Sequence, residues 1–164
     1  MKVNKTDETI EFILEGAIGE GAPLFQQDVR NFKEVVMDME QVTYINSVGV
    51  KAWIQWTGRI APGAKFILRK LPLVMINQAS TVVGFMPPHA RIESFFAPFV
   101  CPDCNTETTM LFTRGKEYEY EEAGAEKRFD IPEISCPKCK AAMEADFTPA
   151  KTFSFLDLPQ KSAS

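Results

Sequence analysis

The stretch that decides the fold of this 164-residue chain is residues 35–49, which read VVMDMEQVTYINSVG. Its beginning is apolar and β-branched, and it predicts a buried strand over residues 34–39. The pair Asn46-Ser47 then favours the start of a helix, because short polar side chains cap the free N–H groups of a first turn. Apolar residues recur after this pair at helical spacing, which predicts a helix over residues 47–60.

Strand and helix patterns alternate on both sides of this stretch. Strands are predicted over residues 9–16, 34–39, 65–69 and 92–96, and helices over residues 24–32, 47–60 and 73–83. Such alternation implies a mixed or mostly parallel sheet that is covered by helices. The predicted fold class is therefore α/β, and the sequence shows no internal repeat.

Composition and charge limit the class of protein. Hydrophobic residues make up 45% and charged residues 24% of the chain, so it can bury a core and bulk disorder is not expected. The first residues are polar, and no apolar run that suits a signal peptide or a membrane span follows, which predicts a cytoplasmic protein. The net charge of −4 falls on residues 100–164, because residues 1–99 are neutral. This acidic part disfavours nucleic-acid binding, since it repels phosphate backbones.

All four cysteines stand in two CxxC pairs, Cys101 with Cys104 and Cys136 with Cys139. Two residues between thiols allow one tight turn to present both sulfurs to a tetrahedral ion, and a reducing cytoplasm favours metal ligands over disulfides. We therefore predict one structural Zn²⁺ bound by all four thiolates. A redox CxxC pair or a catalytic zinc is the alternative, although four cysteines leave no coordination position open.

The C-terminal part resembles a zinc ribbon over residues 99–156. Its two cysteine pairs stand further apart than the common spacing of roughly 15–20 residues. Strands predicted over residues 106–113 and 127–131 are expected to pair and so bring the ends of this long segment together. Residues 142–147 are expected to add a third strand. The acidic run EYEYEE, residues 117–122, is expected to be a solvated edge or loop, and the alternative is that its tyrosines dock a partner.

Other residues that could bind a ligand receive a structural interpretation. His89 is the only histidine and stands in a proline-flanked loop, where a ligand role is not expected. Five aromatic residues are expected in the core or at an interface between domains, rather than in a ligand site: Trp53, Trp56, Phe95, Phe96 and Phe99. The sequence shows no Ser/His/Asp set, no phosphate-cradling glycine loop and no carboxylate–histidine cluster, so an enzyme is not expected.

The N-terminal part resembles the STAS family, the sulfate transporter and anti-sigma factor antagonist domains, over residues 2–97. Residues 12–16 (FILEG) and the pair Asp38-Met39 match strand ends of that family. Residues 46–49 (NSVG) stand where the family has Asp-Ser-Ser-Gly. The resemblance implies a mixed sheet with covering helices. It also implies binding to a protein such as a kinase-type anti-sigma factor, a phosphatase or another signalling protein.

The same resemblance implies a regulatory role for Ser47, because this position is phosphorylated by a partner kinase in anti-sigma factor antagonists. A helix N-terminus also suits an anion by itself, through its free N–H groups and its dipole. Asn46, Ser47, Val48 and Gly49 are expected to form the partner-binding face, with Gly49 permitting close approach of another chain. The alternative is that Ser47 is an ordinary N-cap, which contributes about 1 kcal/mol.

Three parts are expected along the chain: a STAS-like α/β domain over residues 1–97, a zinc ribbon over residues 98–157 and a flexible tail over residues 158–164. The expected function is that of a non-catalytic regulatory module that binds a protein. One alternative is a structural or assembly protein that oligomerises through the STAS-like domain. Another is a regulator that binds nucleic acid through the ribbon. The sequence leaves the oligomeric state open.

Overall fold

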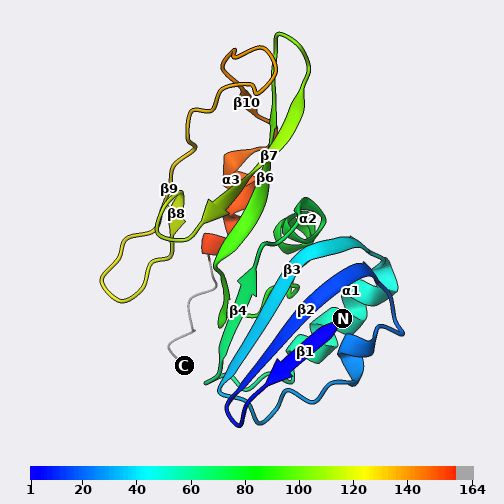
Figure 1. The fold of residues 1–164 in the computed structure, drawn as a ribbon. Helices are drawn as coiled ribbons and strands as arrows, with labels where there is room; N and C mark the ends of the chain where they lie inside the picture. Colours follow the sequence, from blue (N-terminus) through cyan, green and yellow to red (C-terminus); the bar gives the residue numbers. More distant parts are fainter. Residues whose placement is uncertain (158–164) are drawn as a thin grey trace.

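Three β-sheets, two of them with more than two strands, organise residues 1–157, which are the residues that the computed structural model describes (Figure 1). The larger sheet has five strands in the order β1-β2-β3-β4-β5. Its strands are β1 (Lys2–Lys5), β2 (Thr9–Ile18), β3 (Glu34–Ile45), β4 (Lys65–Arg69) and β5 (Ala90–Ile92). The smaller sheet has the order β10-β6-β7, and β8 pairs separately with β9. These strands are β6 (Ser94–Val100), β7 (Glu107–Thr113), β8 (Tyr118–Glu119), β9 (Arg128–Phe129) and β10 (Glu144–Ala145).

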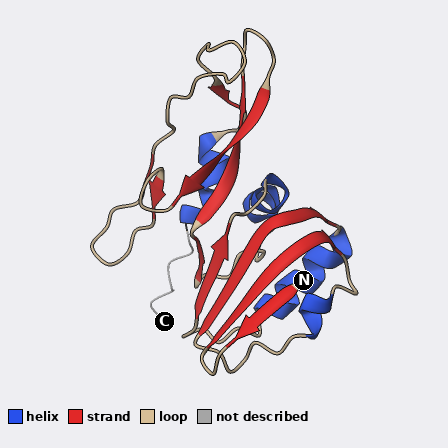
Figure 2. Cartoon of the chain, in the orientation of Figure 1, coloured by secondary structure: helices blue, strands red, loops and turns tan. Residues whose placement is uncertain are grey.

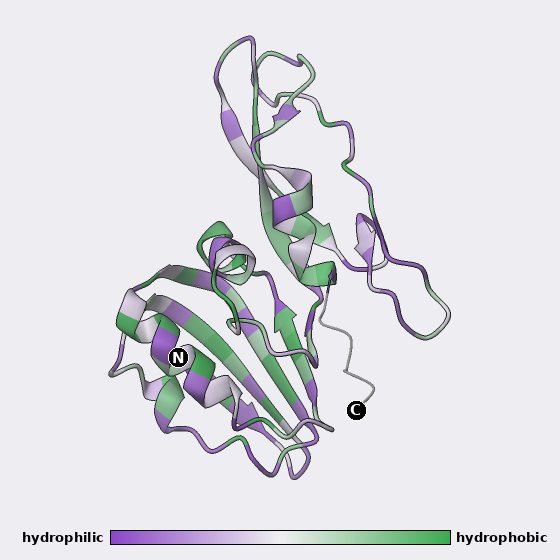
Figure 3. Cartoon of the chain, turned by 180° about the vertical axis from the view of Figure 1, so that it is seen from behind, coloured by the Kyte–Doolittle hydropathy of each residue, from purple (hydrophilic) through white to green (hydrophobic). Residues whose placement is uncertain are grey.

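The larger sheet confirms the predicted α/β class with a mixed sheet. Strands β2 to β5 run parallel to their neighbours, and β1 is antiparallel to β2. A buried row crosses the four parallel strands in register: Ile10, Val35, Phe66 and Ala90. Figure 3 shows hydrophobic residues along the strands and hydrophilic residues in the loops at one end of this sheet.

Helix α1 (Ser47–Thr57) covers one face of the larger sheet with two buried tryptophans (Figure 2). The ring of Trp56 meets Phe12 of β2 edge-on, with 5.6 Å between the ring centroids. The indole N–H of Trp53 donates to the carbonyl oxygen of Phe85 at 2.9 Å, and that of Trp56 donates to Gln27 at 3.0 Å. Because both indole groups are satisfied, the two rings can lie in the core without an unpaired donor.

The remaining helical segments are short. They are η1 (Pro23–Gln26), α2 (Leu73–Thr81), α3 (Pro149–Thr152) and η2 (Phe153–Leu156). The helix predicted over residues 24–32 is therefore wrong, because only one 3-10 turn forms. The chain turns at Asp28, whose carboxylate accepts hydrogen bonds from the backbone and the guanidinium of Arg30. These hydrogen bonds hold the pKa of Asp28 at about 2 and replace the helical pattern with a local turn.

The strand predicted over residues 92–96 proves to belong to two sheets. The chain leaves the larger sheet after Ile92 and enters the smaller one at Ser94, so Glu93 marks the change. Strand β6 then runs through Ala97 and Pro98 without a break. The expected boundary between residues 97 and 98 consequently lies inside a strand.

The strand pairing predicted for the ribbon is also wrong. Residues 107–113 pair with β6, and residues 128–129 pair with β8, so the two segments expected to pair do not meet in one ladder. A short cysteine turn joins β6 to β7, and this local hairpin closes a much smaller loop than the predicted pairing. The third predicted strand is confirmed in part, because β10 pairs with the other side of β6.

One hydrophobic core extends through both sheets. Phe95 of β6 contacts Phe153 and Phe155 of the C-terminal turns, with 5.6 Å between the ring centroids in each pair. Helix α2 lies against β3 of the larger sheet and β6 of the smaller one. The smaller sheet is thus packed onto the rest of the molecule. The expected tail, residues 158–164, lies outside the described residues. No helix among residues 1–157 has the length and apolar character needed to cross a membrane.

Candidate functional site

A tight backbone turn carries the first cysteine pair at the far end of the smaller sheet (Figure 1). The N–H of Asn105 donates to the carbonyl oxygen of Cys101 at 2.9 Å, and the N–H of Cys101 donates to that of Thr106 at 2.9 Å. Asn105 has a φ of 59°, a left-handed conformation that asparagine tolerates better than most residues. The turn directs the Cys101 and Cys104 side chains to the same place.

The second cysteine pair repeats this geometry. The N–H of Lys140 donates to the carbonyl oxygen of Cys136 at 3.0 Å, and the N–H of Cys136 donates to that of Ala141 at 2.7 Å. Lys140 has a φ of 68° and occupies the place that Asn105 has in the first turn. Two segments far apart in the sequence therefore fold into the same turn, each presenting a pair of thiols.

The four sulfur atoms converge on one point. All lie within 4.8 Å of one another. The Sγ atoms of Cys101 and Cys139 are 3.4 Å apart, and those of Cys104 and Cys136 are 3.6 Å apart. Thiolates bound to a tetrahedral ion at about 2.3 Å lie about 3.8 Å from one another. The structure thus brings the four predicted cysteines to a spacing that suits one tetrahedral metal ion.

Hydrogen bonds and the closeness of the other thiols shift the pKa values of Cys136 and Cys139 in opposite directions. Backbone N–H groups of Cys139 and Lys138 lower the pKa of Cys136 to about 6. The N–H of Ala141 lowers the pKa of Cys139, but the neighbouring thiols outweigh it and raise that pKa to about 12. Four sulfurs this close cannot all ionise unaided, because each thiolate repels the next. A divalent cation would remove that obstacle and bind all four as thiolates.

Helix α1 begins at the second predicted site. Asn46, not Ser47, is the N-cap: its Oδ1 accepts a hydrogen bond from the N–H of Gly49 at 2.7 Å. Ser47 is the first helical residue and is exposed. On either side of it, Tyr44 is 56% exposed and Val48 is 47% exposed. The N-cap alternative for Ser47 is therefore wrong, and its hydroxyl faces solvent among apolar neighbours.

Gly49 does not belong to this exposed face. It is buried, and a Cβ at this position would lie 2.3 Å from the carbonyl oxygen of Ile18. The glycine lets the first turn of α1 approach the end of β2 in the same chain. The expectation that Gly49 permits approach of another chain is thus corrected, and the exposed surface consists of Tyr44, Asn46, Ser47 and Val48. We call these four residues the helix-start surface.

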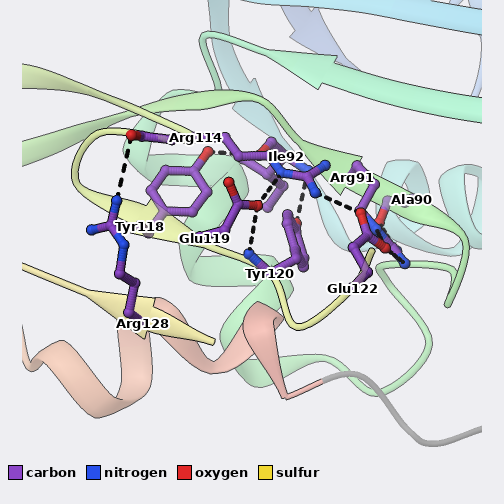
Figure 4. Close-up of polar contacts among 10 residues, drawn as sticks. Ala90, Arg91, Ile92, Arg114, Tyr118, Glu119, Tyr120, Glu122 and Arg128 are labelled. Carbon is purple, nitrogen blue, oxygen red and sulfur yellow. Dashed lines mark hydrogen bonds and ion pairs between the residues drawn. The ribbon is translucent and has the colours of Figure 1, made fainter. Parts of the chain in front are cut away.

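Residues 117–122 were expected to be a solvated edge or loop, but their two tyrosines are folded into the core and are not free to dock a partner. Tyr118 and Tyr120 are buried, and Figure 4 shows both rings directed toward Ile92. The hydroxyl of Tyr118 donates to the carbonyl oxygen of Ile92 at 2.6 Å, and the hydroxyl of Tyr120 accepts from its N–H at 2.8 Å. The two hydroxyls occupy the outer edge of β5. The alternation of tyrosine with glutamate, which places the rings on one side, was the signal for this arrangement.

Two arginines complete this contact, which we call the tyrosine latch. The guanidinium carbons of Arg91 and Arg114 lie 4.9 Å and 4.8 Å from the centroid of the Tyr120 ring. Both arginines also pair with Glu122, at 2.8 Å and 2.6 Å. Hydrogen bonds from these arginines lower the pKa of Glu122, while burial raises the pKa of both latch tyrosines. The latch therefore joins the edge of the larger sheet to β8 and to the end of β7 through neutral hydroxyls and paired charges.

Comparisons with protein-family models, with curated proteins and with solved structures gave no match. The STAS and zinc-ribbon resemblances accordingly remain predictions that rest on sequence motifs.

His89 borders a cavity of about 1120 Å³ between β4 and the latch. Phe66, Ile67 and Leu156 contribute apolar walls to this cavity. Burial and the nearby Arg91 lower the pKa of His89, and its Nε2 finds no hydrogen-bond partner among residues 1–157. Within the same residues, the four cysteines form the only set of three or more potential ligands placed to hold a metal.

Proposed function

We propose that this protein is a non-catalytic regulatory module that binds another protein through the helix-start surface. The observation that carries this proposal is the exposure of Ser47 between Tyr44 and Val48, which are two exposed large hydrophobic side chains. A hydroxyl among exposed apolar groups can be recognised by a kinase and contacted by a partner. The partner class, a kinase-type anti-sigma factor, a phosphatase or another signalling protein, follows from the STAS resemblance.

The position of Ser47 suits a phosphorylation switch. The N–H of Gly49 is satisfied by Asn46, whereas the N–H groups of Ser47 and Val48 have no acceptor among residues 1–157. A phosphate there would add about −1.5 to −2 charges beside free donors and the positive end of the helix dipole. It would change the charge of the helix-start surface without disturbing the cap.

We further propose that the four cysteines bind one structural Zn²⁺ in a cytoplasmic protein. Four thiolates fill a tetrahedral shell, so the ion would hold the two turns together without an open position for a substrate. Metal analysis of the purified protein should give one zinc per chain. Substitution with Co²⁺ should give the visible spectrum of tetrahedral thiolate coordination. A Cys139→Ser variant that kept both signals would contradict this assignment.

Pull-down from a lysate of the source cell tests the binding proposal. The baits are zinc-loaded wild type, Ser47→Ala, Ser47→Asp and Gln55→Glu. The last variant adds a negative charge to an exposed position of α1 away from its start. A partner held by wild type, Ser47→Ala and Gln55→Glu but lost with Ser47→Asp supports a phosphorylation-dependent contact. Equal recovery on all four baits argues against the switch, and loss on Gln55→Glu as well argues against a contact confined to the helix-start surface.

A further inference from the structure

Three of the four edge strands in the two larger sheets carry a protective feature. Free backbone groups at a sheet edge pair readily with another strand, and proteins block them with charge, short length or a cover. Strand β1 has only four residues and carries Lys2 and Lys5. The tyrosine latch covers β5, and β10 has only two residues.

Strand β7 is neither short nor covered by another segment of residues 1–157, and its one charged residue, Glu107, stands at its first position. It is seven residues long, reads ETTMLFT and forms the edge of the smaller sheet. Its sequence is rich in strand-forming residues and contains no lysine or proline. The N–H of Cys101 donates to Thr106 and the N–H of Arg114 donates to Glu93, so residues with even numbers face β6 along this ladder.

The odd-numbered residues of β7 consequently direct their backbone groups away from the sheet. The turn that follows already satisfies Thr113: its N–H donates to the Glu117 carboxylate, and its carbonyl oxygen accepts from Lys116. The outward groups of Glu107, Thr109 and Leu111 have no partner among residues 1–157. All three side chains are exposed as well, Leu111 by 37%.

We propose that β7 pairs antiparallel with β7 of a second copy of this chain, about a two-fold axis at Thr109. The three free positions are symmetric about Thr109, so a second copy presents the matching set. Thr109 then faces Thr109, and Glu107 of each copy faces Leu111 of the other. Each such pair exchanges two hydrogen bonds, about six in all. The two sheets join into one continuous sheet across the axis.

The charged and apolar side chains of β7 are compatible with pairing to a second copy in this register. The two Glu107 carboxylates lie about 14 Å apart along the strands, and that distance exceeds the Debye length of about 8 Å at physiological salt. On the opposite side of the new ladder, Met110 of each copy faces Thr108 of the other. The pairing thus brings exposed Leu111 and half-buried Met110 against side chains without placing like charges opposite each other.

Because Thr109 faces Thr109 of the other copy, substitutions at this position test the proposed dimer. Sedimentation velocity of the zinc-loaded full chain is run over a concentration series for wild type, Thr109→Lys and Thr109→Glu. The wild type should form a dimer. The dimer dissociation constant of each variant alone should be at least about tenfold higher than that of the wild type, because like charges then meet across the axis. An equimolar mixture of the two variants should regain the dimer, because lysine then faces glutamate.

Gln55→Lys is the control, since it places the same charge on an exposed helical position remote from β7, and it should keep the wild-type dimer. Recovery in the mixture also shows that both variants are folded. A wild type that stays monomeric up to its highest soluble concentration overturns the proposal. Undiminished dimer formation by Thr109→Lys alone also overturns the proposal. Failure of the equimolar mixture to form the dimer overturns it too.

Discussion

Gly49 shows how one missing side chain positions the helix-start surface. A Cβ there would lie 2.3 Å from the carbonyl oxygen and 3.1 Å from the carbonyl carbon of Ile18, and neither backbone atom can rotate away. Gly49→Ala should therefore lower the free energy of unfolding by about 1–3 kcal/mol. Urea unfolding measures it, with Gly63→Ala as control, because nothing lies within 4 Å of a Cβ at Gly63. Equal stability of the two variants would contradict the described packing.

Lys140 holds a left-handed conformation that glycine would adopt without strain. Its φ is 68°, and the matching residue in the first cysteine turn, Asn105, has a φ of 59°. Lys140→Gly should raise the free energy of unfolding of the metal-loaded protein by about 0.5–1 kcal/mol, the relieved strain less the entropy lost by glycine. Asn105→Gly should gain less, since asparagine tolerates this conformation. Thermal melting of both variants checks the order, and a larger gain at Asn105 would contradict it.

Among single residues, the sequence predicted those roles that depend only on the spacing of neighbours along the chain. Two residues between thiols were enough to select the four cysteines, because the turn itself sets their direction. The roles of Asn46, Ser47 and Gly49 were not separable in the same way. Either polar residue can cap a helix, and the closeness of Ile18 to Gly49 depends on a strand more than thirty positions earlier in the chain.

The tyrosine latch is the element that joins the edge of β5 to β8 and, through Arg114, to the end of β7. Tyr118→Phe leaves the buried carbonyl oxygen of Ile92 without its donor, and Tyr120→Phe leaves its N–H without an acceptor. Each change should lower the free energy of unfolding by about 1–3 kcal/mol. Tyr44→Phe is the matched control and should change little, because Tyr44 is 56% exposed. The free energy of unfolding is measured in urea. An equal loss in Tyr44→Phe and in the two latch variants would contradict the role given to Tyr118 and Tyr120.

The latch also predicts a dependence on alkaline pH. Burial raises the pKa of Tyr118 and of Tyr120 in the folded protein, whereas a tyrosine in the unfolded chain ionises near pH 10. The latch contribution is therefore fully present below about pH 10 and is lost as the pH rises further, because the unfolded chain releases its protons first. The stability difference between wild type and the Tyr118→Phe, Tyr120→Phe double variant should shrink over that range. A difference that stays constant with pH would contradict this assignment.

Elements were predictable where the pattern was local and periodic. Strand β4 matches residues 65–69 as predicted, and α1 begins at the predicted Ser47. The pairing of β7 with β6 was not predictable from composition, because residues 107–113 read equally well as a partner for residues 127–131. The change of sheet at Glu93 was not predictable either, since Ile92, Phe95 and Phe96 suit one strand and the polar pair Glu93-Ser94 between them does not by itself indicate a break.

Across the whole molecule, the shared core predicts that the metal stabilises both sheets. The only two tryptophans, Trp53 and Trp56, lie in α1 beneath the larger sheet, so their fluorescence reports unfolding there. Chelation should lower the melting temperature seen by this fluorescence, because losing the cysteine turns loosens the smaller sheet and its latch. Readdition of zinc should restore it. A tryptophan signal that melts at the same temperature with and without metal would show that the larger sheet is independent.

The order in which the latch and the cysteine turns occur along the chain matters during synthesis. Strand β5 is complete once Ile92 has been made, but the tyrosines that cover its edge and the second cysteine turn come later. At about 5–20 residues per second, on the order of 1–6 s separate the synthesis of Ile92 from that of Tyr120. Throughout that interval a nascent chain has a parallel sheet with an uncovered edge. We therefore expect mispairing with neighbouring nascent chains to be concentrated in this window, before the tyrosine latch has been made.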